Sequence, residues 1–488
     1  MKNALNIRHI VLLALFSVFI SMFANGSIAF TNPDEVFYAQ TAKEMSQHQT
    51  WMVPYIFGQP QFEKPIFLCW LLRLSFLLFG VTPFAGRFFP ALFAVFGALG
   101  IYFFGILGFR DSKKAFISGL IFITSALCVG LAKTIFTDLI FSVFILFSFL
   151  AFFWGYTYEE KRPLCVILSF VSSGLAVLTK GPLGFLIPAL CIGVFLFIRK
   201  DKRYILTKSH FFGLLIFAII TVPWYAYVTA KYGQAFIHEF FYNDHWRRLI
   251  EAEHMRNDKW YFYPLSTIGC MFPWSFYSAA ALFYLFRRDK YSKSAVHVFL
   301  GSWICLTLLI FQVCHSKLAS YIFPLFPAVA LITGDFICDS AIIKKNMIRN
   351  VYMLAFLPFM LVCAIPFAAG RIEPYVSSKL SSEYLLKNYR INNAILCSKP
   401  YVRGVRFYTD KDVAVMDVGG KDFFSPHPIP FLNTEQKVVD FLRRQETTYC
   451  VFKKSAAEDI GRILGRQFTI ETLKVEGNEY IVKIESLA

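Results

Sequence analysis

Three short polar clusters carry the residue types that could do chemistry in this largely apolar sequence. They are the segment 32–38 with Asp34 and Glu35, the segment 62–65 with Glu63 and Lys64, and the Thr137-Asp138 pair. Carboxylates of this kind can bind a divalent cation, orient a sugar or accept a proton. A lysine beside them can neutralise the negative charge that develops on a departing phosphate. The clusters can form one site only if the chain brings them to the same side of a membrane.

Composition indicates that such a membrane is present. Hydrophobic residues make up 56% and aromatic residues 18% of the 488 positions, far from the composition of a soluble protein. The formal net charge is +17, but the basic residues concentrate in short connections between apolar segments. That distribution is typical of orientation across a bilayer, and we therefore expect a polytopic membrane protein without a nucleic-acid partner.

The apolar segments predict about eleven transmembrane helices, since a helix needs roughly 20 apolar residues to cross the hydrocarbon core. The segments lie near 10–30, 88–109, 115–131, 139–157, 164–179, 183–198, 211–228, 263–286, 295–314, 321–338 and 351–369.

The distribution of cations predicts the orientation. With the N-terminus inside, the inward connections carry groups of Lys and Arg at 110–114, 161–162, 199–208, 287–293 and 344–349. The short outward connections carry one lysine each: Lys133, Lys180 and Lys317. This is the positive-inside pattern, and it places the long connections 31–86 and 229–261 outside. Asp34, Glu63 and Asp138 then share the outer side.

The first outward loop is expected to be structured. Asparagine is common at a helix N-cap, and we expect Asn32 in that position. Pro33 would then be the first helical residue and Glu35 would have the spacing of a capping box. Residues 64–79 predict a second apolar helix. We expect these helices to lie along the membrane interface.

The polar tail predicts a separate domain. Strand-like runs near 393–397, 413–417, 448–452 and 480–484 alternate with a helical stretch at 434–444. We therefore divide the chain into a transmembrane domain, 1–370, and a small C-terminal α/β domain, 371–488, also outside. The tail lacks a glycine-rich phosphate loop, and no nucleotide cofactor is expected. Cys397 and Cys450 could pair in an oxidising compartment.

Each of the carboxylates could have a functional role or could only cap a helix. Asp34 near a helix N-terminus would remain an anion, which favours a functional role. Glu35 could only cap the helix, and Asp138 could only cap the span that follows it.

The cations are also open to two interpretations. Lys64, Lys180 and Lys317 could bind phosphate or simply extend toward the membrane surface. In the second long loop, Arg247 and Arg248 suit bidentate phosphate contact, and His245 is a weak candidate metal ligand. Such a loop could close over a bound substrate.

Taken in order, these motifs resemble those of the bacterial membrane glycosyltransferases of the GT-C class. The resemblance is to the 4-amino-4-deoxy-L-arabinose lipid A transferases and related protein-mannosyltransferase-like enzymes. It covers most of residues 8–340. The matching elements are Asp34-Glu35-Val36-Phe37-Tyr38 (D-E-x-x-Y), Phe62-Glu63-Lys64-Pro65 (F-E-K-P), Thr137-Asp138, Thr179-Lys180-Gly181-Pro182, the loop with His245, Arg247 and Arg248, and Ser316-Lys317 through Tyr321 to Pro324.

The resemblance implies transfer of a sugar from a polyprenyl-phosphate carrier, with inversion, at the periplasmic face of the bacterial inner membrane. The acceptor would be lipid A or another envelope molecule. Asp34 and Asp138 would belong to the catalytic carboxylates, and Glu63 would be a ligand of a divalent metal ion. We also count Glu35 among the candidate catalytic carboxylates and His245 as a weak candidate metal ligand. The donor and acceptor phosphates would be bound by Lys64, Lys180, Arg247, Arg248, Lys317 and Tyr321.

Two alternatives remain at this point. A protein O-glycosyltransferase, such as a mannosyltransferase, would use the same donor class with a serine or threonine acceptor. A lipid transporter or flippase is less favoured, because transporters place charged residues near the bilayer midplane, often in inverted repeats.

Overall fold

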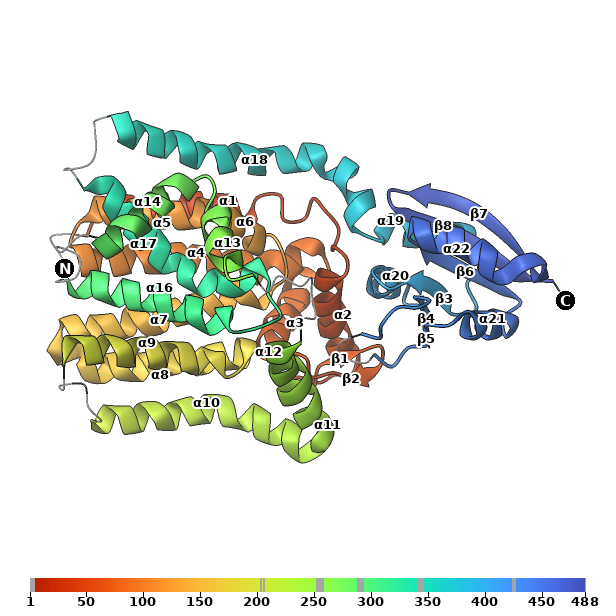
Figure 1. Cartoon of the computed structure of the whole chain (residues 1–488), viewed down its shortest axis with the longest axis horizontal. Helices are drawn as coiled ribbons and strands as arrows, with labels where there is room; N and C mark the ends of the chain where they lie inside the picture. Colours follow the sequence, from red (N-terminus) through yellow and green to blue (C-terminus); the bar gives the residue numbers. More distant parts are fainter. Residues whose placement is uncertain are drawn as a thin grey trace. The chain divides into compact units, whose positions relative to one another are not determined.

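The computed structural model describes residues 5–201, 204, 207–251, 259–287, 294–339, 346–423 and 427–487. The cationic connections expected at 199–208, 287–293 and 344–349, and the middle of the second long loop, fall wholly or partly outside these residues. The chain forms two compact units (Figure 1). Unit 1 comprises Met1–Phe23, Phe62–Leu71 and Arg87–Cys363; unit 2 comprises Ala24–Gln61, Leu72–Gly86 and Ala364–Ala488.

Unit 1 is helical. Its elements, some of which continue into unit 2, are α1 (Ile7–Met22), α3 (Phe67–Phe79), α4 (Pro83–Phe109), α5 (Ser112–Thr124), α6 (Ala126–Ala132), α7 (Thr137–Thr157), η2 (Glu159–Lys161), α8 (Arg162–Lys180), α9 (Leu183–Arg199), α10 (Lys208–Tyr232), α11 (Gln234–Phe236), the π-helix η4 (Ile237–Arg247), α12 (Arg248–Ile250), α13 (Phe262–Cys270), α14 (Ser275–Arg287), α16 (Ala295–Gln312), η5 (Ala319–Leu325), α17 (Phe326–Cys338) and α18 (Asn346–Val376).

Within the described residues, seven helices are long and apolar enough to cross a membrane. The bent pair α5 and α6, with 62° between its members, would make an eighth. Three shorter apolar helices are α1, α3 and α9. The predicted helical membrane architecture is confirmed, whereas the count of about eleven spans and the interfacial placement of the first loop stay predictions. The span expected at 263–286 is two helices, α13 and α14.

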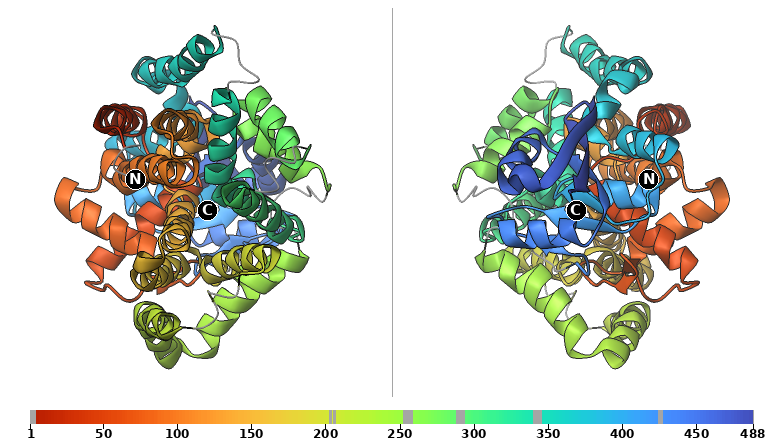
Figure 2. Two further views of the ribbon diagram at one scale, coloured as in Figure 1. Left: turned by 90° about the vertical axis from the view of Figure 1, so that its left-hand side faces the viewer. Right: turned by 90° about the vertical axis from the view of Figure 1, so that its right-hand side faces the viewer.

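Helix packing in unit 1 relies on close approach and on aromatic side chains. Helices α7, α8 and α10 lie side by side, and the long helices are seen nearly end-on in Figure 2. A Cβ at Gly105 of α4 would lie 2.8 Å from the Ala115 Cα of α5, so only glycine permits this crossing. Phe149 of α7 packs on Trp303 of α16 with ring centroids 4.5 Å apart. Such packing holds the ends of α7 and α8 in fixed positions.

Unit 2 contains a six-stranded sheet in the order β5-β4-β3-β6-β8-β7. Strands β3, β4, β5 and β6 are parallel, whereas β8 runs antiparallel to both β6 and β7. The strands are β3 (Ile395–Ser398), β4 (Val413–Met416), β5 (Phe431–Leu432), β6 (Thr447–Phe452), β7 (Phe468–Glu476) and β8 (Glu479–Ser486). The unit also contains a short hairpin, β1 (Tyr55–Ile56) and β2 (Gln59–Pro60), and the helices α2 (Asp34–Gln47), α19 (Lys379–Asn388), α20 (Val402–Thr409), α21 (Glu435–Arg443), α22 (Lys454–Leu464) and η6 (Gly465–Gln467).

Helices cover both faces of this sheet, as expected for parallel strands. Val438 of α21 and Ile460 of α22 belong to the core on one face. Leu385 of α19 and Val405 of α20 belong to the core on the other. The α/β tail predicted from the sequence is therefore confirmed, although the proposed boundary at residue 370 falls inside α18 and stays a prediction.

The predicted pairing of Cys397 with Cys450 is wrong, since both are buried free thiols. The pair in register across β3 and β6 is Leu396 with Cys450. Side chains alternate between the faces of a sheet, so Cys397 points to the opposite face from Leu396. Accordingly, Cys450 packs in the α21 and α22 core and Cys397 in the α19 and α20 core.

Candidate functional site

The centre of the candidate site in unit 1 is a buried carboxylate held by two cations. Asp244 lies in the π-helix η4, and its Oδ1 accepts from Lys64 Nζ at 2.5 Å. Arg248, one helical turn further, lies 2.9 Å from the same oxygen through NH1. The side chains of Asp244, Lys64 and Arg248 are only 5%, 14% and 17% exposed. The FEKP element and the second long loop therefore meet at one carboxylate.

Electrostatics keep this carboxylate ionised. Burial alone would raise the pKa of Asp244, but the charges of Lys64 and Arg248 outweigh burial and lower it. Burial and the Arg248 charge lower the pKa of Lys64, while Asp244 and Glu63 oppose that shift. Two buried cations therefore meet at one carboxylate, where they could also bind an anionic ligand.

A second ion pair joins Asp138, in the first turn of α7, to Lys180, the last residue of α8. Lys180 Nζ contacts Asp138 Oδ1, and the side chains of Lys180 and Asp138 are 13% and 5% exposed. The same ammonium lies 4.5 Å from the Tyr321 ring centroid. Asp138 lies in the first turn of α7, whose N-cap, Phe136, makes no side-chain cap hydrogen bond. Asp138 therefore binds a cation and does not cap the helix.

The turn after Lys180 packs against His245. Gly181 has φ of 100°, and a Cβ there would lie 2.6 Å from His245 Nε2. His245 Nδ1 lies 2.7 Å from the Phe240 carbonyl oxygen, and burial lowers the pKa of His245. This contact links the ion pair of Lys180 to the triad of Asp244, because His245 and Asp244 are neighbours in η4.

The His315–Lys317 segment is fixed to the same loop. The Ser316 amide donates to the Arg248 carbonyl at 3.2 Å, and the His315 amide donates to the Leu249 carbonyl at 3.2 Å. Lys317 is 4% exposed, with its ammonium 5.8 Å from the centroid of the Tyr263 ring. The Lys317 side chain is therefore packed within the protein.

Sequence reasoning missed two acids of this site, Asp244 and Glu239. Glu239 Oε1 accepts from the Phe62 amide at 2.9 Å and so holds the FEKP turn. Burial raises the pKa of Glu239 to about 7, with smaller contributions from Glu63 and Asp244. Glu239 and Asp244 are five residues apart, which matches the i to i+5 repeat of a π-helix and not the period of an α-helical face. The only available signal was that Asp244 stands beside His245.

The structure does not show Arg247, Glu63 or His245 in the roles expected of them. Arg247 Nε donates to Glu251 Oε2 at 2.7 Å, in a half-exposed pair. Among the described residues, no group of three or more His, Cys, Asp or Glu side chains could hold a metal ion. A metal at Glu63 or His245 stays a prediction.

Asp34 and Glu35 belong to unit 2. Asp34 is the exposed first residue of α2, and Glu35 is buried. The expected N-cap is wrong: Pro33 occupies that position, and Asn32 Nδ2 donates to Ser378 Oγ instead. Glu35 Oε2 accepts from the Thr31 amide at 3.0 Å and from its hydroxyl at 2.9 Å. Glu35 thus stabilises the turn that enters α2, in keeping with the structural alternative.

Comparison with known proteins gives related sequences. Residues 63–227 match the family model of dolichyl-phosphate-mannose-protein mannosyltransferases. An uncharacterized protein of Aquifex aeolicus is 31% identical over 343 residues, which cover 70% of this chain and 66% of that protein. The undecaprenyl phosphate-alpha-4-amino-4-deoxy-L-arabinose arabinosyl transferase 2 of Proteus mirabilis is 30% identical over 362 residues, covering 73% of this chain and 64% of the relative. The matched regions thus span slightly less than two thirds of these relatives.

A solved structure shares the fold over nearly the whole chain. The crystal structure of ArnT from Cupriavidus metallidurans bound to undecaprenyl phosphate has a TM-score of 0.78 and 17% sequence identity, and the match covers 97% of each chain. The sequence relatives and this fold together make the chain similar to the undecaprenyl-phosphate aminoarabinose transferases and to the protein mannosyltransferases.

Proposed function

We propose that this protein transfers a sugar from a polyprenyl-phosphate carrier to lipid A or another envelope acceptor. The reaction would occur, with inversion, at the periplasmic face of the bacterial inner membrane. The arabinosyl transferases among the relatives support the donor class, since their names specify an undecaprenyl-phosphate-linked sugar. The distribution of cations between the apolar segments supports the orientation.

The observation that carries this proposal is the pair of buried cations, Lys64 and Arg248, that meet at Asp244. In the transfer, an acceptor oxygen forms a bond to the anomeric carbon while the bond from that carbon to the carrier phosphate breaks. The departing phosphate keeps the electron pair. Lys64 and Arg248 would neutralise its charge, and their burial would strengthen this stabilisation. A single displacement of this kind inverts the anomeric centre.

The carboxylates would have different tasks. Asp138, ionised beside Lys180, would orient the sugar or the acceptor. Asp34, at the N-terminus of α2, is the predicted catalytic carboxylate. A phosphate acceptor such as that of lipid A is already an anionic nucleophile and needs no general base, whereas a serine hydroxyl does. This chemistry favours a lipid phosphate acceptor over the protein O-glycosyltransferase alternative.

The test combines analysis of the cell envelope with a purified reaction. We expect mass spectrometry of lipid A to lose one sugar substituent when the gene is deleted and to regain it on complementation. Purified enzyme in lipid nanodiscs should transfer the sugar from the lipid-linked donor to lipid A, and Asp34→Asn should abolish transfer. Unchanged lipid A together with unglycosylated envelope proteins would instead indicate the protein-acceptor enzyme. Full activity of Asp34→Asn would refute the catalytic assignment.

A further inference from the structure

The helix that begins with Asp34 is held at several points by the C-terminal residues of its own unit. From these contacts we propose that Ser378, Glu479 and Asp410 are positioning residues that set the place of α2, and with it Asp34, for sugar transfer. The inference rests on the proposed function, because it assumes that Asp34 acts in the reaction. It gives the C-terminal α/β domain a task that its sheet alone does not suggest.

The first contact fixes the entry to α2. Asn32 Nδ2 donates to Ser378 Oγ at 2.6 Å, and Ser378 Oγ donates to Glu479 Oε1 at 2.6 Å. Ser378 is 0% and Glu479 2% exposed, so this chain of hydrogen bonds is shielded from water. The backbone amide of Asn32 also donates to the Val376 carbonyl at 2.8 Å. The residue two positions before Asp34 is thereby tied to strand β8, which Glu479 begins.

Close approach of α20 supports the same entry point. A Cβ at Gly404 would collide with Asn32 Oδ1, so a larger residue in α20 would displace the Asn32 side chain. The Phe30 amide donates to Tyr408 Oη of α20 at 2.9 Å. Backbone and side chain of the segment before α2 are thus both bound by C-terminal residues.

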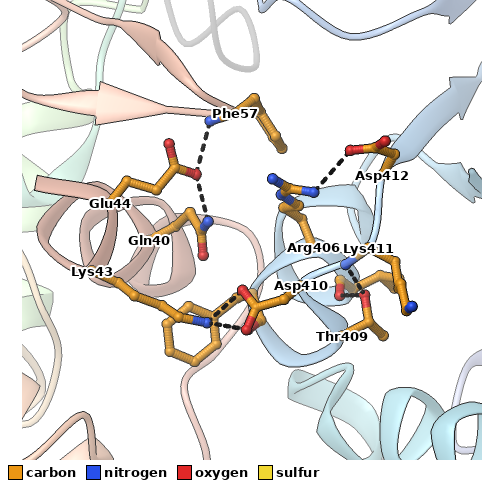
Figure 3. Close-up of polar contacts among 11 residues, drawn as sticks. Gln40, Lys43, Glu44, Phe57, Arg406, Thr409, Asp410, Lys411 and Asp412 are labelled. Atoms are coloured by element: carbon orange, nitrogen blue, oxygen red, sulfur yellow. Dashed lines mark hydrogen bonds and ion pairs between the residues drawn. The ribbon is translucent and has the colours of Figure 1, made fainter. Parts of the chain in front are cut away.

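The second contact fixes the C-terminal half of α2. Lys43 Nζ donates to both carboxylate oxygens of Asp410, at 2.6 and 2.8 Å (Figure 3). It also donates to the Phe407 carbonyl at 3.3 Å. Asp410 ends α20 with φ of 52°, a conformation that Asp and Asn tolerate better than most residues. The neighbouring Glu44 binds the amides of Phe57 and Gly58 at 3.0 and 2.8 Å, which ties α2 to the β1–β2 turn.

A third contact lies within the DEVFY element itself. The guanidinium carbon of Arg403 lies 4.7 Å from the Phe37 ring centroid. Val36, Ala39 and Met45 are fully buried, so α2 is packed along its length. A helix held in this way moves as one body, and a change at either end shifts Asp34 in its exposed first turn. Misplacement of a reacting group by about 1 Å can cost a hundredfold in rate.

The test compares full-length variants in lipid nanodiscs by steady-state kinetics. Asp410→Asn removes the charge that binds Lys43 but keeps a residue that tolerates positive φ. Its matched control is Asp412→Asn, since Asp412 is 90% exposed and pairs with Arg406 of α20 at 3.1 Å. We expect Asp410→Asn to lower kcat about threefold and Asp412→Asn to leave it unchanged, with the donor KM within twofold for both.

The buried contact gives the larger effect and a conservative rescue. Ser378→Ala should lower kcat about tenfold, and so should Glu479→Leu, because both break the hydrogen-bond chain. Glu479→Gln keeps an acceptor oxygen for Ser378 and should retain most of the activity. This rescue distinguishes a positioning role from a general loss of folding. A loss of folding would lower the amount of active enzyme in both Glu479 variants, whether or not they keep an acceptor oxygen.

The outcomes separate this inference from the proposed function. If Asp34→Asn is inactive but Asp410→Asn and Ser378→Ala keep the native kcat, the positioning role is refuted and the proposed function stands. A fall in donor affinity at constant kcat would also refute positioning of Asp34. If Asp34→Asn retains full activity, the catalytic assignment fails first, whatever the other variants do.

Discussion

Asp244 and Asp138 of unit 1 and Glu479 of unit 2 are buried in opposite ways. In unit 1, Asp244 and Asp138 are bound by Lys64, Arg248 and Lys180, and the cations lower the pKa of Asp244. In unit 2, Glu479 receives a neutral hydroxyl, and burial raises its pKa to about 7.

The difference indicates two tasks for buried acids. A buried carboxylate that contacts cations can exchange them with an anionic ligand. A buried carboxyl group with neutral donors mainly stabilises the local structure.

The largest expected effect is on catalysis in unit 1. Lys64→Met removes one cation from the triad while keeping an apolar stem, and we expect kcat for sugar transfer to fall about a hundredfold. Lys231→Met is the matched control, because Lys231 is exposed and contacts the rings of Tyr227 and Tyr232. Steady-state assays with the lipid-linked donor measure both. Equal losses in the two variants would contradict a specific role for the triad.

The next effect is on stability. Asp244→Asn leaves Lys64 and Arg248 buried without their counter-charge, and we expect it to destabilise the protein by about 3 kcal/mol. Glu251→Gln is the control, since its pair with Arg247 is more than half exposed on the Glu251 side and should contribute less than about 1 kcal/mol. Unfolding in mild detergent measures both. A stable Asp244→Asn protein would show that the triad does not need its anion.

The pH dependence of unfolding tests the contrasting acid in unit 2. The pKa of Glu479 is raised to about 7 in the fold, above the ordinary carboxyl value, so the folded state keeps a proton that the unfolded state loses. The resulting stabilisation is complete below the ordinary pKa and is lost as the pH rises through about 7. Glu479→Gln should therefore flatten the fall in unfolding temperature between pH 5 and pH 8.

Some pH dependence of the unfolding temperature should remain in Glu479→Gln, because the pKa of Glu239 in unit 1 is also raised to about 7. An unchanged slope in Glu479→Gln would show that Glu479 is not protonated in the fold at neutral pH.

The smallest effect concerns the cysteines of the sheet. Because Cys397 and Cys450 face opposite cores, reductant should not change the unfolding temperature. Burial raises the pKa of both thiols, so alkylation should require unfolding. A non-reducing peptide map that shows a linked pair would overturn the observed register.

Much of the site was accessible from short sequence patterns. Lys64, Asp138 and Lys180 stand next to a proline, a glycine or a span end, where the chain emerges from apolar helices. Asp244 could not be assigned a role, because its partner Lys64 lies 180 residues away and no local rule pairs them. Glu239 was hidden by the π-helix, whose repeat differs from the period used to predict a helical face.

The sequence by itself determined the class of the protein: apolar length, cation distribution and alternating strand runs are local properties of the chain. Tertiary structure decided which charges meet, that Asn32 binds Ser378 and does not cap α2, and that two cysteines on neighbouring strands face apart. The physical reason is that hydrophobic periodicity specifies which elements form, whereas the pairing of polar groups depends on distances set only when those elements pack.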